Sequence, residues 1–171
     1  MPSEIQFKNL LQVLDKHKDT RVIFTKANAD TDGRIINKMI DEYVEVNKDR
    51  CIAFTSLGQV RYLSTLQFCK AIVGNSSSGI IEAPSFYIPT VNIGNRQLGR
   101  IAAKTVVHCG YSVEEIEGAM GLVMTKEYQE DIKGRINPYE GCNTSRDIVE
   151  IIVEFLSKKS GIKKRFYDIR F

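Results

Sequence analysis

The stretch Ala71-Ile72-Val73-Gly74-Asn75-Ser76-Ser77-Ser78-Gly79-Ile80-Ile81-Glu82 decides the fold. Its first four residues form a short apolar run with β-branched side chains, which is typical of a buried strand. Small hydroxyl residues and a glycine follow, and a helical pattern begins near Ser78. A strand that turns directly into a helix is the repeating unit of a parallel sheet.

The same alternation of short apolar strands and amphipathic helices continues along the chain. Strands are predicted at 21–25, 51–54, 71–74, 90–93 and 105–108, and helices at 4–16, 35–44, 60–69 and 113–123, from 78 and from 143. The pattern predicts an α/β domain with a Rossmann-like, doubly wound parallel sheet that helices cover on both faces. The first predicted element is a helix, although a doubly wound half normally begins with a strand. The opening strand is therefore expected to have been lost or to come from elsewhere.

Length and composition exclude several classes of protein. The chain has 171 residues, 43% of them hydrophobic, which indicates one folded domain and excludes global disorder. A net charge of +3 gives no sign of a nucleic-acid partner, and the basic tail at 159–171 is expected to be solvated. The lack of a long apolar run and of an apolar signal core at the N-terminus predicts a cytoplasmic protein with no membrane partner.

The cysteines and histidines do not suggest a metal site. The four cysteines are widely separated, without a Cys-x-x-Cys pair, and the chain has two histidines. Reduced, buried thiols are expected, and Cys142 is expected to be packed. No metal or cofactor is predicted.

Ligands of a doubly wound sheet bind at the carboxyl ends of its strands, so the residues that follow each strand are the candidates. After the third strand, the 76–79 segment (Ser-Ser-Ser-Gly) enters a helix whose free N–H groups could bind a diphosphate. Glu82 lies one turn further, where its carboxylate could accept hydrogen bonds from sugar hydroxyls. An ordinary serine cap, with Glu82 complementing the helix dipole, would explain the same residues, and spacing leaves both readings open.

Three other strand ends carry small or polar residues. Arg96 lies in a glycine-bounded loop after the fourth strand, where it could contact phosphate or simply face solvent. Asn28 follows the first strand and is placed to meet a ligand, whereas Asp30 or Thr31 is expected to cap the next helix. The turn at 55–58 (Thr-Ser-Leu-Gly) follows the second strand, and its backbone could bind the edge of a flat base. The four strand ends together predict one crevice for a ligand.

Five segments carry a resemblance to a known family: 24–30 (FTKANAD), 74–86 (GNSSSGIIEAPSF), 88–94 (IPTVNIG), 96–100 (RQLGR) and 137–139 (NPY). Together they closely resemble the hydrolysing UDP-N-acetylglucosamine 2-epimerases of sialic-acid pathways. Non-hydrolysing epimerases usually carry an acidic residue and paired glycines in the loop after the third strand. The Asn-Ser-Ser-Ser-Gly version at 75–79 therefore points to the hydrolysing branch.

The resemblance implies a GT-B architecture, in which UDP-sugar lies between two Rossmann-like halves. This chain, residues 1–171, resembles the C-terminal, UDP-binding half as a single domain, without the N-terminal half and the first strand. The implied UDP-binding residues are Asn28, Thr55, Ser56, Leu57, Ser76, Ser77, Ser78, Gly79, Glu82 and Arg96.

The resemblance also assigns a role to each part of this set. Ser76, Ser77 and the Gly79 backbone would hold the diphosphate, Glu82 the ribose hydroxyls, and residues 55–57 the uracil. Asn28 would contact the nucleotide, and Arg96 the diphosphate or the sugar.

The implied reaction eliminates UDP across C1–C2 of the sugar, after which water adds to the 2-acetamidoglucal and N-acetylmannosamine is released. In the family, the acid/base carboxylates come chiefly from the N-terminal half. No catalytic residue is therefore assigned within this chain, which is expected to be inactive by itself.

The implied partners are UDP or a UDP-sugar and the missing half. The sequence leaves open whether the protein forms a homo-oligomer and which 2-acetamido sugar it uses. A non-catalytic nucleotide-sugar-binding module and half of a GT-B glycosyltransferase are the alternatives.

Overall fold

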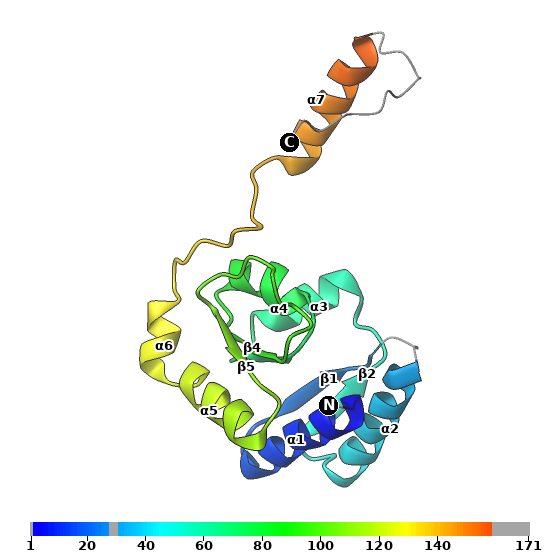
Figure 1. Ribbon diagram of the computed structural model, residues 1–171, viewed down its shortest axis with the longest axis vertical. Helices are drawn as coiled ribbons and strands as arrows, with labels where there is room; N and C mark the ends of the chain where they lie inside the picture. The colour runs from blue at the N-terminus through cyan, green and yellow to red at the C-terminus, as the bar shows by residue number, and fades with distance from the viewer. Residues whose placement is uncertain (1, 28–30, 159–171) are drawn as a thin grey trace, which may run out of the picture. The chain divides into compact units, whose positions relative to one another are not determined.

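The computed structural model describes residues 2–27 and 31–158. The chain divides into two compact units, Met1–Pro138 and Tyr139–Phe171. The first unit contains the strands and most of the helices, and α7 (Thr144–Ser157) belongs to the second (Figure 1). Asn28, Asp30 and the basic tail lie outside the described residues.

The first unit alternates strands and helices, as the sequence predicts. Its elements are α1 (Ser3–Lys16), β1 (Val22–Thr25), α2 (Thr31–Val46), β2 (Cys51–Phe54), α3 (Gly58–Leu66), β3 (Ile72–Gly74), α4 (Ser78–Ile81), the 3-10 helix η1 (Ala83–Phe86), β4 (Thr90–Ile93), β5 (Val106–Cys109), α5 (Val113–Val123) and α6 (Lys126–Asp131). The predicted α/β class with parallel strands is confirmed.

The strands are divided between two sheets rather than joined in one. β1 pairs with β2, with Val22 opposite Cys51, and the second sheet has the order β3-β4-β5, with Ile72 opposite Thr90. Every pair is parallel. The sequence pattern specifies each strand but not which strands become neighbours, so the division was not predicted.

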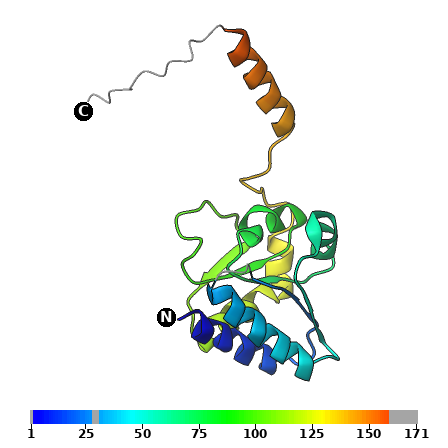
Figure 2. The ribbon, with the colours of Figure 1, turned by 90° about the vertical axis from the view of Figure 1, so that its right-hand side faces the viewer.

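One hydrophobic core is shared by both sheets. Helix α1 packs between α2 and α5 in a single layer (Figures 1 and 2). The buried core residues come from this layer and from both sheets: Leu10, Val13, Leu14, Phe24, Ile40, Tyr43, Cys51, Val91, Ile93, Ile116, Ala119, Met120 and Val123. At about 25 cal/mol per Å² of buried apolar surface, this shared burial is the main force that holds the two sheets in one unit.

Coverage of the strands by other elements is uneven. All four residues of β4 are buried, whereas all three residues of β3 are half-buried. In the two-stranded sheet, Ile23, Ile52 and Phe54 remain 46%, 48% and 36% exposed. The expectation of helices on both faces therefore holds around β4, whereas the β1–β2 face that α3 borders is covered only in part.

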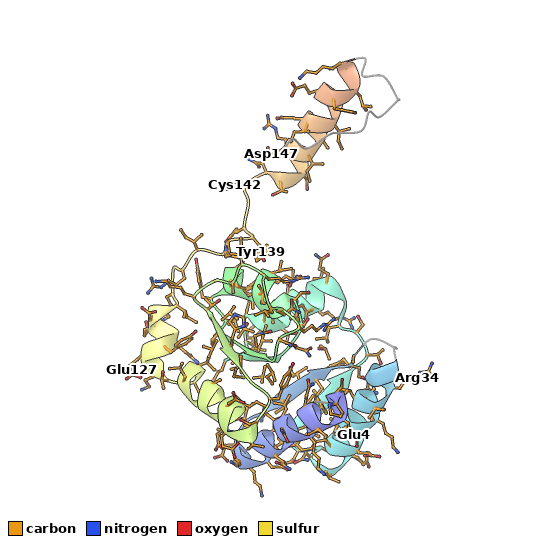
Figure 3. The ribbon with its side chains drawn as sticks, viewed as in Figure 1. Glu4, Arg34, Glu127, Tyr139, Cys142 and Asp147 are labelled. Carbon is orange, nitrogen blue, oxygen red and sulfur yellow. The ribbon has the colours of Figure 1, made fainter. Side chains whose placement is uncertain are left out.

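Local chemistry explains where the helices differ from the prediction. The helix that begins at Ser78 stops after four residues and continues as η1, because Pro84 has no N–H to donate to the preceding turn. Helix α6 was not predicted, since its sequence Lys-Glu-Tyr-Gln-Glu-Asp has no apolar stripe. Cys142 was expected to be packed, and this was wrong: it is exposed in the second unit (Figure 3).

Helix α7 begins after Asn143, as predicted, although Asn143 adopts a left-handed conformation (φ 61°) and makes no side-chain cap. The helix is strongly amphipathic, but none of its residues is buried. Its exposed apolar side chains include Ile148, Ile151, Ile152 and Phe155. No helix among the described residues is both long enough and apolar enough to cross a membrane.

Candidate functional site

The serine loop, which is the segment 74–78 between β3 and α4, presents backbone donors. Gly74 has φ 150°, a conformation that favours glycine and turns the chain sharply out of β3. The Ser76 hydroxyl accepts a hydrogen bond from the Ser78 N–H at 3.4 Å, whereas the N-cap residue of α4, Ser77, makes no side-chain cap. The N–H groups of Ser76 and Ser77 have no acceptor within the described part of the chain. Such free donors are suited to an anion.

Gly79 lets α4 lie directly against the second sheet. The Thr90 hydroxyl donates to the Gly79 carbonyl at 2.8 Å, and a Cβ at position 79 would lie 2.5 Å from Thr90 Cγ2. Both residues are buried. A glycine is therefore required at this position by the close approach of α4 to β4.

Glu82 is the residue that follows the last turn of α4, and one of its carboxylate oxygens lacks a hydrogen-bond partner among the described residues. Its N–H donates to the Ser78 carbonyl at 2.9 Å, but its Oε2 is buried and has no hydrogen-bond partner among the described residues. Asn137 Nδ2 donates to the Ile81 carbonyl at 2.8 Å and to the Ser85 hydroxyl oxygen at 2.7 Å, so it contacts residues on both sides of Glu82. A buried acceptor without a donor is costly, so this position is suited to the hydroxyl groups of a ligand.

Tyr62 links α3 to the start of α4, because its hydroxyl is hydrogen-bonded to the Ser78 hydroxyl. Burial raises the pKa of Tyr62, and the negative charge of Glu82 raises it further. The phenol therefore stays protonated at neutral pH. It remains a neutral hydrogen-bonding group beside the serine loop rather than a second negative charge.

The loop after β4 is fastened to the loop after β3. Gln97 is 4% exposed and donates from Nε2 to the Asn75 carbonyl at 2.8 Å, while Arg96 Nη1 lies 3.4 Å from Asn75 Oδ1. These contacts place the Arg96 guanidinium next to the segment that carries the free N–H groups. Positive charge and backbone donors thus meet at one place, which favours an anionic ligand.

Tyr111 packs against the start of the loop that follows β4. Its hydroxyl donates to Asn95 Oδ1 at 2.9 Å, and its ring lies against Gly94, where any Cβ would collide with it. Gly94 has φ 76°, so glycine is favoured there on conformation as well. This packing fixes the starting point of the segment that carries Arg96.

The segment after β2 is held by a local hydrogen bond. Thr55 and Ser56 are exposed, and Ser56 Oγ accepts from the Gly58 N–H at 3.1 Å. Leu57 lines a hollow of about 550 Å³ together with side chains of β1, β2 and α3. Within the described residues, no hydrogen bond joins residues 55–57 to the serine loop.

The structure therefore brings together only part of the predicted set. Residues 76–79, Glu82 and Arg96 form one cluster around the carboxyl ends of β3 and β4. Asn28 lies outside the described residues, and the UDP-binding roles of the whole set remain a prediction.

Four supporting residues were not identified as site residues from the sequence: Tyr62, Asn75, Gln97 and Asn137. Asn75, Gln97 and Asn137 fall in the segments that carry the family resemblance. This resemblance was the signal in the sequence that could have identified them. Tyr62 lies outside those segments, and only the fold places it next to Ser78.

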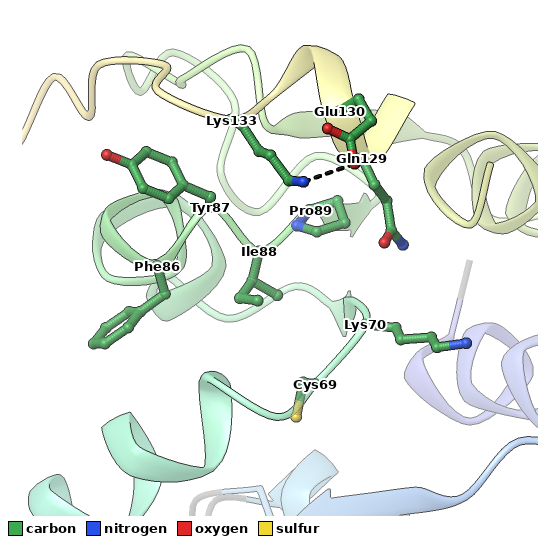
Figure 4. Close-up of a pocket in the computed structure, with 9 residues that line it drawn as sticks. All are labelled: Cys69, Lys70, Phe86, Tyr87, Ile88, Pro89, Gln129, Glu130 and Lys133. Atoms are coloured by element: carbon green, nitrogen blue, oxygen red, sulfur yellow. Dashed lines mark hydrogen bonds and ion pairs between the residues drawn. The ribbon is translucent and has the colours of Figure 1, made fainter. Parts of the chain in front are cut away.

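A second hollow, of about 450 Å³, lies at the opposite, amino ends of β3 and β4 (Figure 4). Cys69 and Lys70 border it from the start of β3, and Tyr87 to Pro89 from the start of β4. Lys133, on its rim, is ion-paired with Glu130 at 2.6 Å. No group of three or more metal-ligating side chains occurs in the described ranges.

Fold and site define the class of protein. The chain is an α/β domain with parallel strands that gathers free backbone N–H groups, an arginine and an unpaired carboxylate at the carboxyl ends of its strands. The model of the UDP-N-acetylglucosamine 2-epimerase family matches residues 2–153. The chain belongs to this family.

Named relatives agree with this membership. The chain is 34% identical over 164 residues to the GDP/UDP-N,N'-diacetylbacillosamine 2-epimerase (hydrolyzing) of Campylobacter jejuni, covering 96% of the chain and 42% of that protein. It is 32% identical over 165 residues to the polysialic acid biosynthesis protein P7 of Escherichia coli, again covering 96% of the chain and 42% of the relative. The chain thus spans less than half the length of these relatives.

Solved structures share the fold. The S. aureus MnaA–UDP co-structure matches with a TM-score of 0.68 at 19% identity, over 97% of this chain and 44% of that one. UDP-GlcNAc 2-epimerase from Neisseria meningitidis bound to UDP-GlcNAc matches with a TM-score of 0.62 at 18% identity, over 88% and 40% of the two chains. These likenesses confirm the predicted fold class, that of a half of a GT-B architecture.

Proposed function

We propose that this chain is the UDP-binding half of a hydrolysing UDP-N-acetylglucosamine 2-epimerase. The observation that carries the proposal is the buried, unpaired Glu82 carboxylate oxygen beside the free N–H groups of the serine loop. A nucleoside diphosphate offers both matching parts, ribose hydroxyls for the carboxylate and phosphate oxygens for the N–H groups. Family membership supports the same assignment.

In this proposal, the serine loop and Arg96 hold the diphosphate, which is the leaving group of the reaction. Donors directed at the departing phosphate stabilise the negative charge that grows there as the C1–O bond breaks. Removal of the C2 proton calls for a base near the sugar. Glu82 is the only carboxylate in the cluster described here, and binding the ribose occupies it, so the base comes from outside this chain.

The full reaction then requires the remaining half. The assembled enzyme eliminates UDP from UDP-N-acetylglucosamine, adds water to the resulting glucal and releases N-acetylmannosamine for sialic-acid-type biosynthesis. A diacetylated bacillosamine sugar is a second candidate substrate, because the Campylobacter jejuni relative carries that name. A cytoplasmic setting is consistent with four cysteines that are all free thiols.

Calorimetry with UDP and UMP tests the binding site. Wild-type chain should bind UDP more tightly than UMP, since the second phosphate adds contacts to the serine loop and Arg96. Glu82→Gln should weaken UDP binding about tenfold, as expected when a charged acceptor of hydrogen bonds is lost. The exposed Glu114 on α5 provides the matched control, Glu114→Gln, which should leave the affinity unchanged.

Absence of UDP binding at about 1 mM ligand, a free energy near −4 kcal/mol, would contradict the proposed site. Equal weakening by Glu82→Gln and Glu114→Gln would contradict the role of Glu82. Once the other half is supplied, release of free N-acetylmannosamine supports the epimerase. Transfer of the sugar to an acceptor would instead support a glycosyltransferase.

A further inference from the structure

We propose that Asn137 is a positioning residue, which holds in place the backbone that carries Glu82 and so prepares its carboxylate for the ribose hydroxyls of a nucleotide. The inference rests on the proposed function, because Asn137 acts through Glu82. The two residues belong to distant segments of the sequence, and the fold connects them through hydrogen bonds from Asn137 to Ile81 and Ser85.

The change from α4 to η1 leaves the Ile81 carbonyl without its helical donor. In a continuous α-helix this carbonyl would accept from the N–H four residues further along, which belongs to Ser85. The Ser85 N–H instead donates to the Glu82 carbonyl at 3.1 Å, because the chain has entered the 3-10 helix. Asn137 Nδ2 donates to the Ile81 carbonyl at 2.8 Å and thus takes the place of the missing backbone donor.

The amide group of Asn137 also spans Glu82. Its second hydrogen bond, at 2.7 Å, goes to the Ser85 hydroxyl oxygen, which lies on the other side of Glu82 in the sequence. Within this span, the Glu82 N–H donates to the Ser78 carbonyl at 2.9 Å. The backbone on both sides of the carboxylate is therefore tied to one side chain from a distant segment.

Asn137 is well placed for this task because it is 2% exposed. Water competes little for donors that are buried to this extent, and a hydrogen bond is stronger in such surroundings than in water. The next residue is Pro138, whose ring keeps the backbone of Asn137 out of the helical region. The side chain thus extends from a segment that is restricted in its own conformation.

Glu82 depends on such support because its Oε2 is buried and has no hydrogen-bond partner among the described residues. An unpaired acceptor is costly, and a fixed backbone keeps it in place until a ligand supplies donors. The bonds from Asn137 lie at the end of α4 that carries Glu82, whereas the serine loop lies at its start. Loss of Asn137 should therefore weaken binding of the ribose hydroxyls and leave binding of the phosphates largely unchanged.

The test compares UDP with its 2′,3′-dideoxy analogue, which keeps the base and both phosphates but lacks the two ribose hydroxyls. Calorimetry on the full chain gives the ratio of the two dissociation constants. The wild-type chain should bind UDP about tenfold more tightly, since the analogue has no hydroxyls to donate to the charged carboxylate. Asn137→Leu keeps the size of the side chain and removes both donors. It should lower the ratio to about threefold, with little change in affinity for the analogue.

Two further variants complete the experiment. Ser85→Ala removes one of the two hydrogen bonds at an exposed residue, so it gives an intermediate ratio and serves if Asn137→Leu does not fold. Asn9→Leu is the matched control, because Asn9 Nδ2 on α1 donates to the Tyr111 carbonyl at the same distance of 2.8 Å. It should lower the stability of the chain and leave the ratio at the wild-type value.

A ratio that stays at the wild-type value in both Asn137→Leu and Ser85→Ala would overturn the positioning role and leave the proposed function intact. Equal losses of affinity for UDP and for the analogue would assign Asn137 to the stability of the fold alone. A fall of the ratio in Asn9→Leu would do the same. A wild-type chain that binds both nucleotides equally well would contradict the role of Glu82 in the proposed function, and the role of Asn137 with it.

Discussion

The two sheets of the first unit differ in how completely the rest of the chain surrounds them. In the β3–β4–β5 sheet, the central strand is fully buried, and the loops that follow β3 and β4 are hydrogen-bonded to each other through Asn75. In the β1–β2 sheet, one face keeps Ile23 and Ile52 about half exposed, and the loop after β2 is fastened only locally. The comparison teaches that the candidate site is built on the sheet whose central strand is fully buried.

The largest expected effect comes from shortening one isoleucine near each sheet, one buried and one half-exposed. Ile80 on α4 is fully buried, and Ile80→Ala should lower the free energy of unfolding by about 2–5 kcal/mol. Ile52 on β2 is 48% exposed, so the chemically identical Ile52→Ala should cost less than about 1.5 kcal/mol. Urea denaturation followed by circular dichroism measures both. Equal costs would show that the two sheets are packed alike.

A smaller effect is expected at the contact between α4 and β4. Gly79→Ala places a methyl group against Thr90 and should destabilise the chain by about 1–3 kcal/mol. Thr90→Ser removes the colliding Cγ2 but keeps the hydroxyl that donates to the Gly79 carbonyl. The double variant should therefore recover part of the loss in the same denaturation experiment. As a control, Gly118→Ala meets nothing within 4 Å and should be neutral or stabilising.

The smallest effect is a pH dependence at the helix that covers β4 and β5. Ser112 and Glu115 form a reciprocal cap at the start of α5, and hydrogen bonds from the Ser112 side chain and backbone hold the pKa of Glu115 below its usual range. A carboxylate with a lowered folded-state pKa stabilises the fold above its unfolded pKa, and this contribution is lost as the pH falls through the folded-state value.

The stability of wild type relative to Glu115→Gln should therefore be greatest near pH 7 and shrink below about pH 4.3. Urea midpoints between pH 7 and pH 3 give this difference directly. Glu114→Gln, on the same helix turn, controls for the loss of an exposed charge. A difference that is constant across the pH range would contradict the assignment.

Much of the fold follows from local pattern. The apolar runs at 51–54 and 90–93 became strands with the predicted bounds, and α5 occupies the predicted range 113–123. These segments are decided by side-chain periodicity within a few residues. The short α4 was less predictable because Pro84 overrides the helical pattern of Ile80 and Ile81.

Other features depend on contacts between distant residues and were not predictable from local pattern. The division into two sheets depends on which strands pair with each other, and the side-chain periodicity within one strand does not specify its partners. At the candidate site, the sequence proposed residues 76–79, Glu82 and Arg96 as ligand-binding candidates, and this stays a prediction. The interactions that position these residues were not predictable from the sequence. Asn137 reaches Ile81 across 56 residues of sequence, and Gln97 is a polar residue whose burial only the fold explains.

The double attachment of Asn75 has a consequence for the entropy of ligand binding. Its carbonyl is held by the Gln97 side chain and its amide oxygen by Arg96, so the loops after β3 and β4 are joined before any ligand arrives. Fixing the backbone of one residue costs about 1–2 kcal/mol of conformational entropy. For these loops that cost is met when the chain folds. Under the proposed function, a nucleotide should therefore lose little affinity to loop ordering, and its binding should carry a small entropic penalty in calorimetry.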